Sequence, residues 1–253
     1  MQLQTYHPLK NEIFHVHTNR CGHAEEVPDR AYVEKAIELG TPRIVFTDHA
    51  PFPGNPFGNR MDIDQLPEYT DSMKKLKEEF DGKIEILAGL EAEYLPGFHG
   101  YLCSMKKEYD LDLLILGQHM YEHEPGDYSF SDDDKSDEYI GLCEAMKKGI
   151  STGLFDVVAH PDRAFRRRKS FGEKEAEAAR ELINCAAFNG VYLEMNYASM
   201  HTKRQFWYEF WDMLSPQALM IYGIDAHSVD EMVKGFEELR NGLEWWEERN
   251  TLW

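Results

Sequence analysis

The sequence predicts an α/β fold in which a parallel sheet closes into one barrel, and three observations support this prediction. Seven short apolar or β-branched runs recur along the chain, segments with helical periodicity lie between them, and the length is 253 residues. Alternating strands and helices favour a parallel sheet with helices outside, and a barrel of this length is commonly one domain. We therefore expect a single domain over residues 1–253.

Most of the expected elements have glycine, proline or aspartate, the residues that end strands and helices, at or beside at least one end. The expected strands are EIFHVH (12–17), RIVFTDH (43–49), KIEILAGLEAEY (83–94), LDLLILGQH (111–119), LFDVVAHP (154–161), GVYLEMN (190–196) and ALMIYGIDAH (218–227). The expected helices lie in 29–40, 66–80, 136–149 and 173–190. Gly40, Gly149 and Gly190 stand where helix C-caps belong.

The amino-acid composition indicates which partners and which cellular compartment to expect. Lys+Arg 27 against Asp+Glu 46 gives a net charge of −19, which argues against nucleic acid or an anionic membrane as a partner. The four cysteines are scattered without a C-x-x-C pair, and the N-terminal segment MQLQTYHPLK lacks an apolar core. These features predict a cytoplasmic protein with free thiols, and the acidic stretch SDDDKSDE (131–138) reads as a solvated loop.

The stretch FHVHTNRCGH (14–23) suggests a metal site. His15 and His17 are separated by one residue, and on a β-strand residues i and i+2 share a face, so the two imidazoles can converge. The other predicted strands also end in polar residues, and in an α/β barrel the C-terminal ends of all strands gather on the face that carries the active site. Asp48, Glu194 and Asn196 are among these residues.

Nine side chains are the candidate metal ligands. One such histidine would more often be a packing residue, but seven of the eleven histidines lie at strand ends or in the adjoining loop, which favours ligation. The candidates are His15, His17, His23, His49, Glu91, His119, His160, Asp225 and His227. Nine ligands suit two or three ions, and mixed imidazole and carboxylate ligation suits Zn, Fe or Mn better than Mg.

Taken in order, the motifs resemble the PHP superfamily (polymerase and histidinol phosphatase), in particular its histidinol-phosphate phosphatase branch. The motifs are HVHTNRCGH (15–23), FTDHAP (46–51), GLEAEY (89–94), ILGQHM (115–120), VVAHPD (157–162), LEMN (193–196) and GIDAH (223–227). The resemblance implies a distorted (β/α)7 TIM-like barrel that holds a trinuclear centre at the C-terminal ends of its strands. By similarity, His15, His17, Glu91 and Asp225 would hold the first ion, His119 and His160 the second with Glu91 bridging, and His23, His49 and His227 the third. Tyr197 and SMHTKR (199–204) depart from the family pattern.

The activity expected from this resemblance is hydrolysis of a small phosphomonoester, histidinol phosphate above all, by a metal-bridging hydroxide. Glu91, Asp225, His227 and Arg163 are the expected catalytic residues, and an aspartate or histidine of the centre would protonate the leaving alcohol. Arg163, Lys203 and Arg204 are candidates for holding phosphate. Glu93 could pair with a substrate ammonium group or orient a metal-bound histidine.

Three alternative functions remain open at this point. The same fold could serve another small phosphomonoester or a phosphodiester. An amidohydrolase also uses an H-x-H strand and a final aspartate, but such enzymes often carry a bridging lysine where this chain has Glu91 and Gln118-His119. A barrel that only binds a ligand is the third alternative, and the complete set of ligands counts against it.

Overall fold

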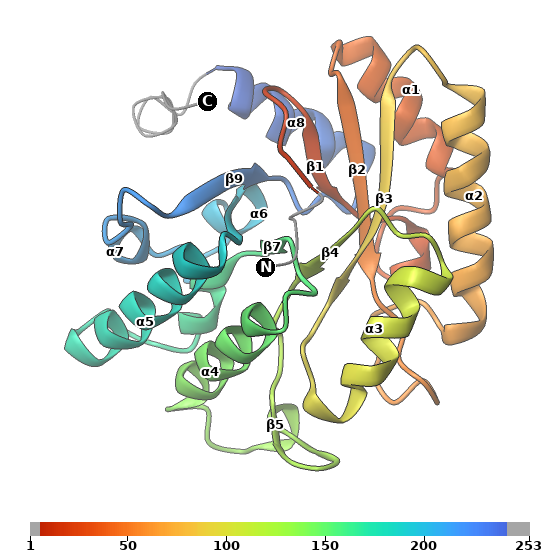
Figure 1. The fold of residues 1–253 in the computed structure, drawn as a ribbon. Coiled ribbons are helices and arrows are strands. Elements are labelled where there is room, and N and C mark those ends of the chain that lie inside the picture. The colour runs from red at the N-terminus through yellow and green to blue at the C-terminus, as the bar shows by residue number, and fades with distance from the viewer. Residues whose placement is uncertain (1–5, 242–253) are drawn as a thin grey trace. The chain divides into compact units, whose positions relative to one another are not determined.

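The computed structural model describes residues 6–241 (Figure 1). The strands are β1 (Ile13–Val16), β2 (Arg43–His49), β3 (Glu85–Ala92), β4 (Leu113–Leu116), β5 (Glu122–Glu124), β6 (Asp127–Tyr128), β7 (Val157–Val158), β8 (Tyr192–Asn196) and β9 (Leu219–Gly223). The helices are α1 (Asp29–Leu39), α2 (Leu66–Glu79), α3 (His99–Glu108), α4 (Glu138–Ser151), α5 (Glu173–Asn189), α6 (Tyr197–Met200), α7 (Tyr208–Trp211) and α8 (Val229–Arg240). Seven strands form one sheet in the order β1-β2-β3-β4-β7-β8-β9.

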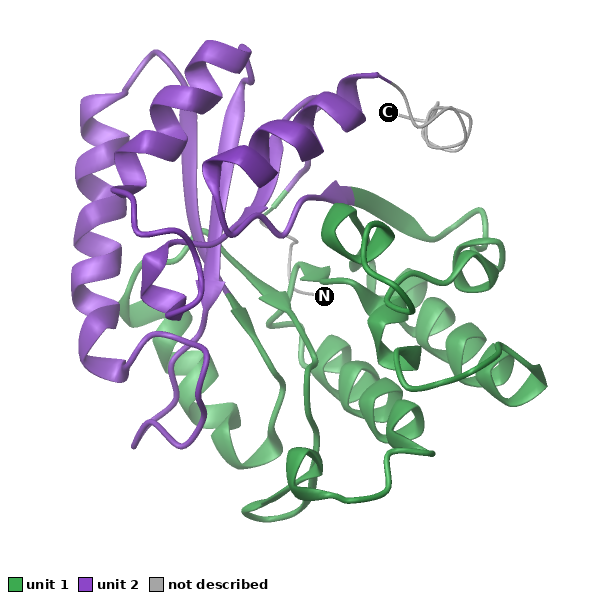
Figure 2. Ribbon diagram, turned by 180° about the vertical axis from the view of Figure 1, so that it is seen from behind, with its two compact units in different colours: residues 1–6, 91–221 green, residues 7–90, 222–253 purple. Residues whose placement is uncertain are grey.

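The chain divides into two compact units, which we call unit 1 (residues 1–6 and 91–221) and unit 2 (residues 7–90 and 222–253) (Figure 2). The division passes through β3 and β9, since each of these strands has residues in both units. The prediction of one domain over the whole chain stays a prediction.

Unit 2 is built around β1 and β2, which pair in parallel with Ile13 opposite Ile44 and Val16 opposite Phe46. After β9, a parallel bridge joins Ala226 to Val16, so the chain returns to the other side of β1. The four residues of β1 are all buried, and β2 is buried except at its last residue. Continuous burial of this kind is expected for parallel strands that are covered on both faces. Helix α1 packs on β2 and on α8.

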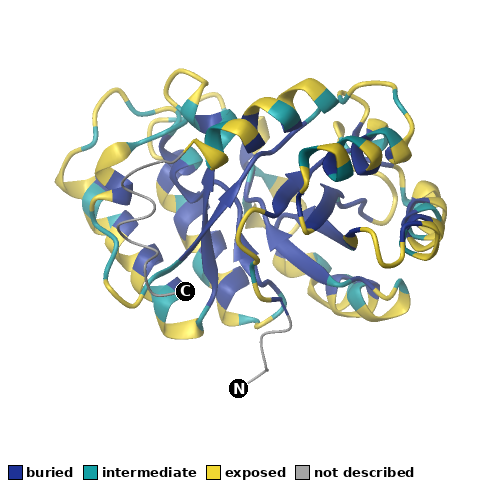
Figure 3. Ribbon diagram, turned by 90° about the horizontal axis from the view of Figure 1, so that it is seen from above, coloured by how far each residue is buried: buried dark blue, intermediate teal, exposed yellow. Residues whose placement is uncertain are grey.

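Unit 1 is built around β4, β7 and β8. Strand β7 pairs in parallel with both neighbours, with Val157 opposite Ile115 on one side and opposite Tyr192 on the other. Helices α4 and α5 pack against one another, and they contact β4 and β8 respectively. The strands are largely buried, whereas the helices expose one side to solvent (Figure 3). Strands β5 and β6 form a separate antiparallel hairpin.

All seven expected strands and all four expected helices occur, and most differences lie at their ends. The runs at 111–119 and 154–161 contribute only the short strands β4 and β7. The residues at the ends of these runs lie in loops and do not extend the sheet. Helices α3 and α8 and the β5–β6 hairpin were not expected from the sequence. Within the described residues, no helix is both long enough and apolar enough to span a membrane.

One expected C-cap is wrong. Gly40 and Gly190 end their helices in the left-handed conformation with φ of 74° and 67°, as predicted. Gly149, however, lies inside α4, which continues to Ser151. A Cβ atom at Gly149 would come within 2.9 Å of the Leu116 and Tyr94 side chains. The glycine is therefore explained by the close packing of α4 on these two residues.

Candidate metal centre

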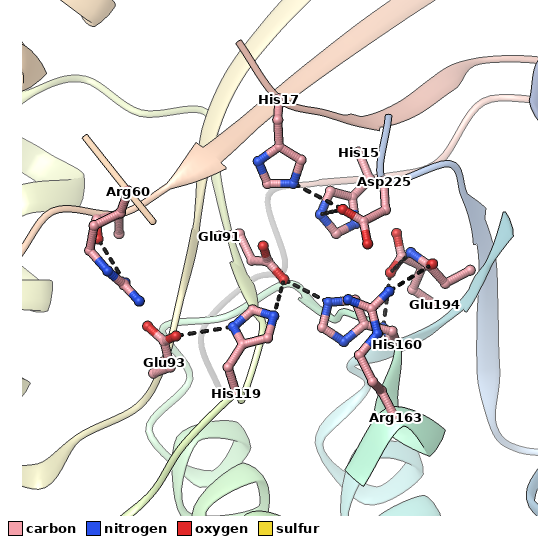
Figure 4. Close-up of polar contacts among 12 residues, drawn as sticks. His15, His17, Arg60, Glu91, Glu93, His119, His160, Arg163, Glu194 and Asp225 are labelled. Carbon is pink, nitrogen blue, oxygen red and sulfur yellow. Dashed lines mark hydrogen bonds and ion pairs between the residues drawn. The ribbon is translucent and has the colours of Figure 1, made fainter. Parts of the chain in front are cut away.

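In unit 2, the end of β1 delivers His15 and His17 to Asp225. The Nε2 atoms of His15 and His17 lie 3.6 and 3.2 Å from Asp225 Oδ1 (Figure 4). This convergence needs local distortion: the pairing register of β1 shifts between Phe14 and Val16, and φ is 70° at His15 and 60° at Asp225. Positive φ values are costly outside glycine and recur at functional sites, where the surroundings enforce them.

His49, His23 and His227 extend this group of imidazoles. The His17 ring lies 4.4 Å from the His49 ring and 4.3 Å from the His227 ring, centroid to centroid, and His23 lies 4.5 Å from His227. One ligand atom from each of His17, His49 and His227 lies within 4.8 Å of the others. We call His15, His17, His23, His49, Asp225 and His227 the histidine group.

Backbone carbonyls fix two of these rings. His23 Nδ1 lies 3.0 Å from the Cys21 carbonyl oxygen, and His227 Nδ1 lies 3.1 Å from the Asp225 carbonyl oxygen. Because a carbonyl only accepts, each Nδ1 must carry the proton, and each Nε2 keeps a lone pair that can bind a metal. Within the described part of the chain, Nε2 of His227 is buried and has no hydrogen-bond partner.

Electrostatics favour the neutral imidazole at His17 and at His227. Burial, reinforced by repulsion from His49 and His227, holds the pKa of His17 well below its usual value. Burial also lowers the pKa of His227. Neutral imidazole is the form that ligates metals, so the uncharged His17 and His227 rings, which stack on one another, fit a cation better than they fit a packed core.

In unit 1, Glu91 is the centre of a second set of ligands. Its carboxyl Oε1 lies 2.8 Å from His160 Nε2 and 3.7 Å from His119 Nε2, while His119 Nδ1 lies 3.0 Å from Glu93 Oε1 (Figure 4). Burial lowers the pKa of His160 to about 4, with a further contribution from the charge of Arg163. Two donors about 3 Å apart are spaced as neighbouring ligands of one ion, whose bonds are about 2.0–2.2 Å long. We call Glu91, His119 and His160 the carboxylate group.

A glycine makes room for the Glu91 carboxyl group. A Cβ atom added at Gly117 would overlap the Oε1, Cδ and Cγ atoms of Glu91. Glu91 is 1% exposed, so its carboxyl group has no open space into which to move. Gly117 belongs to the ILGQHM motif, but its role was not foreseen because sequence does not reveal what packs against a glycine.

The turn that follows His160 is held by hydrogen bonds from several segments. His160 has φ of 33°, and its backbone N–H donates to Glu194 Oε2 at 2.9 Å. The Arg163 guanidinium donates to Ser199 Oγ at 2.9 Å and to Asn196 Oδ1 at 3.2 Å. Arg163 is therefore fixed within unit 1 by side chains from the end of β8 and from α6.

Asp162 ties the same turn to α7. Its Oδ2 accepts from the backbone N–H of Trp207 at 2.9 Å and from Trp211 Nε1 at 3.0 Å. Burial raises the pKa of Asp162 to about 7. Sequence reasoning did not assign a role to this residue.

The structure thus brings together the predicted ligands within each unit. Six of them form the histidine group and three form the carboxylate group. That Glu91 also serves the ion of His15, His17 and Asp225 stays a prediction, because these residues belong to different units. Lys203 and Arg204 lie exposed after α6, and Arg204 has φ of 65°. Their role in holding phosphate also stays a prediction.

The fold and these strand-end ligands define a metal-binding α/β barrel, and comparison with known proteins identifies its family. The chain belongs to the PHP domain family, whose model matches residues 14–198. It is 28% identical over 232 residues to the "Probable histidinol-phosphatase" of Deinococcus radiodurans, covering 86% of both chains. It is 23% identical to the histidinol-phosphatase of Bacillus subtilis, covering 88% of this chain and 96% of the relative.

Solved structures confirm the expected fold. The crystal structure of a protein from Listeria monocytogenes is similar to this structure, with a TM-score of 0.73 and 19% sequence identity. The similarity covers 90% of this chain and 99% of that one. The histidinol phosphate phosphatase of Lactococcus lactis, complexed with Zn, L-histidinol and phosphate, is similar with a TM-score of 0.65 and 21% identity, covering 92% and 94%. The chain has the TIM-like α/β barrel fold that the sequence predicts.

Proposed function

We propose that this protein is a metal-dependent phosphomonoester hydrolase that acts on histidinol phosphate. The observation that carries the proposal is the grouping of the imidazoles of His17, His49 and His227, with ligand atoms within 4.8 Å of one another, in a chain of the PHP domain family. The relatives from Deinococcus radiodurans and Bacillus subtilis, both named histidinol-phosphatases, support the choice of substrate.

Each group would hold metal with its own donors. In unit 2, His15, His17 and Asp225 suit one ion and His23, His49 and His227 suit another, while Glu91, His119 and His160 suit an ion in unit 1. We propose two or three divalent ions, with Zn, Fe or Mn favoured over Mg because most donors are imidazoles. When bound, such ions supply positive charge to the phosphoryl oxygens and make water more acidic.

The protein itself supplies orientation and a further positive charge. The Arg163 guanidinium is fixed by Ser199 and Asn196, so little side-chain entropy remains to be lost when it binds a phosphoryl group. Exposed Lys203 and Arg204 would add weaker attraction for the same anion. The departing alcohol needs a proton, and we propose that an aspartate or histidine of the centre supplies it.

Metal analysis combined with a substrate screen tests this proposal. Protein purified without added metal should contain two or three Zn, Fe or Mn ions per chain by elemental analysis. Steady-state assays should then show faster hydrolysis of histidinol phosphate than of p-nitrophenyl phosphate or a phosphodiester. Metal content near zero without activation by Mn or Zn would reject a metalloenzyme, and no preference for histidinol phosphate would reject the substrate.

Two expectations about the cellular setting complete the proposal. We propose a cytoplasmic location, supported by the free thiols of Cys21, Cys103, Cys143 and Cys185. The net charge of −19 supports a small phosphorylated molecule, brought in by local positive charge, over nucleic acid or membrane as the partner. Apart from the cellular setting, we also propose that residues 1–253 form a single domain.

A further inference from the structure

His119 is the most exposed side chain of the carboxylate group. Its side chain is 32% exposed, against 3% for His160 and 0% for Glu91. It also lies three residues beyond the end of β4, so the sheet does not fix its backbone. Burial alone therefore does not explain how its imidazole is kept in position to bind an ion.

Glu93 holds the imidazole from one side. Its Oε1 lies 3.0 Å from His119 Nδ1, and its own side chain is 1% exposed. A carboxylate accepts the Nδ1 proton, which places the lone pair on Nε2, the atom that faces Glu91 at 3.7 Å. Hydrogen bonding of this kind orients metal-bound histidines and increases their basicity.

Arg166 holds the backbone of the same residue. Its Nη2 donates to the His119 carbonyl oxygen at 3.1 Å and to Glu138 Oε1 at 3.0 Å. The Arg166 side chain is 20% exposed and that of Glu138 only 5%, so the ion pair is largely protected from solvent. It connects the start of α4 and the turn after His160 to the His119 backbone.

We propose that Glu93 and Arg166 are positioning residues that hold His119 at its side chain and its backbone, so that Nε2 is presented as a metal ligand. This inference deepens the proposed function and rests on its metal requirement. It also chooses between the two roles that the sequence leaves open for Glu93, in favour of orienting a histidine over pairing with a substrate ammonium group.

The test for Glu93 uses full-length, metal-free protein and zinc alone. Nitrogen-15 spectra of the histidine rings should show the Nδ1–H tautomer of His119 in the parent and in Glu93→Gln, which keeps an acceptor oxygen, and a mixture of tautomers in Glu93→Ala. Zinc affinity followed on the His119 signals should fall about ten- to a hundredfold in Glu93→Ala and by less in Glu93→Gln. Glu124→Ala, at an exposed position of the hairpin, is the matched control and should bind zinc as the parent does.

The test for Arg166 compares Arg166→Met with Arg167→Met. The Arg167 side chain is 59% exposed and reaches Glu138 only at 4.0 Å, so its variant controls for loss of charge on the same turn. Arg166→Met should weaken zinc binding at His119 severalfold, while Arg167→Met should not. Should Arg166→Met lower the unfolding midpoint too far to be assayed, Arg166→Lys replaces it, and it should retain part of the affinity by keeping a single donor.

Zinc affinity and a His119 tautomer that are unchanged in Glu93→Ala would overturn the proposal. A rise in KM for histidinol phosphate but not for p-nitrophenyl phosphate in that variant would then assign Glu93 to the substrate ammonium group. The measurements of zinc affinity and of the His119 tautomer need no substrate, so they test the proposal even if the protein does not hydrolyse histidinol phosphate.

Discussion

The two groups of ligands hold their imidazoles by different means. In the histidine group, His23 and His227 are oriented by backbone carbonyls, and neighbouring rings stack on one another. In the carboxylate group, His119 and His160 contact the side chains of Glu93 and Glu91. A backbone carbonyl partner remains after most side-chain substitutions, whereas a single substitution removes a carboxylate partner. The carboxylate group should therefore be the more sensitive of the two to substitutions around it.

The largest expected effect comes from Glu91→Gln, which removes the central charge of the carboxylate group. Loss of that ligand should lower metal content and reduce kcat/KM by about a thousandfold or more, since an amide is a poor metal ligand. Circular dichroism should show that the variant remains folded. A folded variant with full activity and full metal content would show that Glu91 is not a metal ligand. The expected difference in sensitivity between the two groups would then have no support.

Gly117→Ala tests the same group without changing any ligand. The added methyl group would overlap the Glu91 carboxyl group and displace it, so we expect metal affinity to fall about ten- to a hundredfold. Gly22→Ala is a control in the loop that carries His23, because a Cβ atom there meets nothing within 4 Å. Since Gly22 has φ of 78°, the control should cost some stability but little metal affinity. Equal losses of affinity in both variants would mean that the overlap with Glu91 is not the cause.

Arg163→Ala tests the charge beside the carboxylate group. A charged hydrogen bond to phosphate contributes about 1.5–3 kcal/mol, so kcat/KM should fall about ten- to a hundredfold while metal content stays that of the parent. Steady-state assays on histidinol phosphate and p-nitrophenyl phosphate measure the effect. If both esters are hydrolysed as well as by the parent, phosphate is held without Arg163. A loss about tenfold smaller is expected for Lys203→Ala, because that residue is exposed.

The last prediction concerns the stability of metal-free protein at acid pH, not its activity. The pKa of His160 is lowered from 6.5 to about 4, so the unfolded chain binds a proton in this range that the folded chain does not. Stability from neutral His160 is thus present at pH 7 and is lost as pH falls from 6.5 toward about 4, by about 2 kcal/mol between pH 7 and 5. Denaturant unfolding at both pH values should show a correspondingly smaller loss in His160→Gln. An equal loss in parent and variant would contradict a buried, neutral His160.

Much of this site could be predicted from local sequence. Periodicity and bounding residues indicated the main strands, because strand and helix periods are written in residue order. The family motifs placed the nine candidate ligands at strand ends or in the adjoining loop, and alternation along the strand already put Glu91 and Glu93 on one face. The backbone distortion at His15 gave no such signal, because its positive φ depends on how β1 pairs with its neighbours.

The amino-acid sequence by itself determined the fold class, the donor types and their order along the chain, since these follow from composition, period and motif. Only the tertiary structure decided which donors meet, which nitrogen of the His23 and His227 rings bears the proton, and which residues contact His119. Gly117 and Arg166 show why: each acts on a residue distant in sequence, one by leaving space for Glu91 and the other by donating to the His119 carbonyl oxygen. Such contacts depend on how segments distant in the sequence pack together, and this packing leaves no periodic pattern in the sequence.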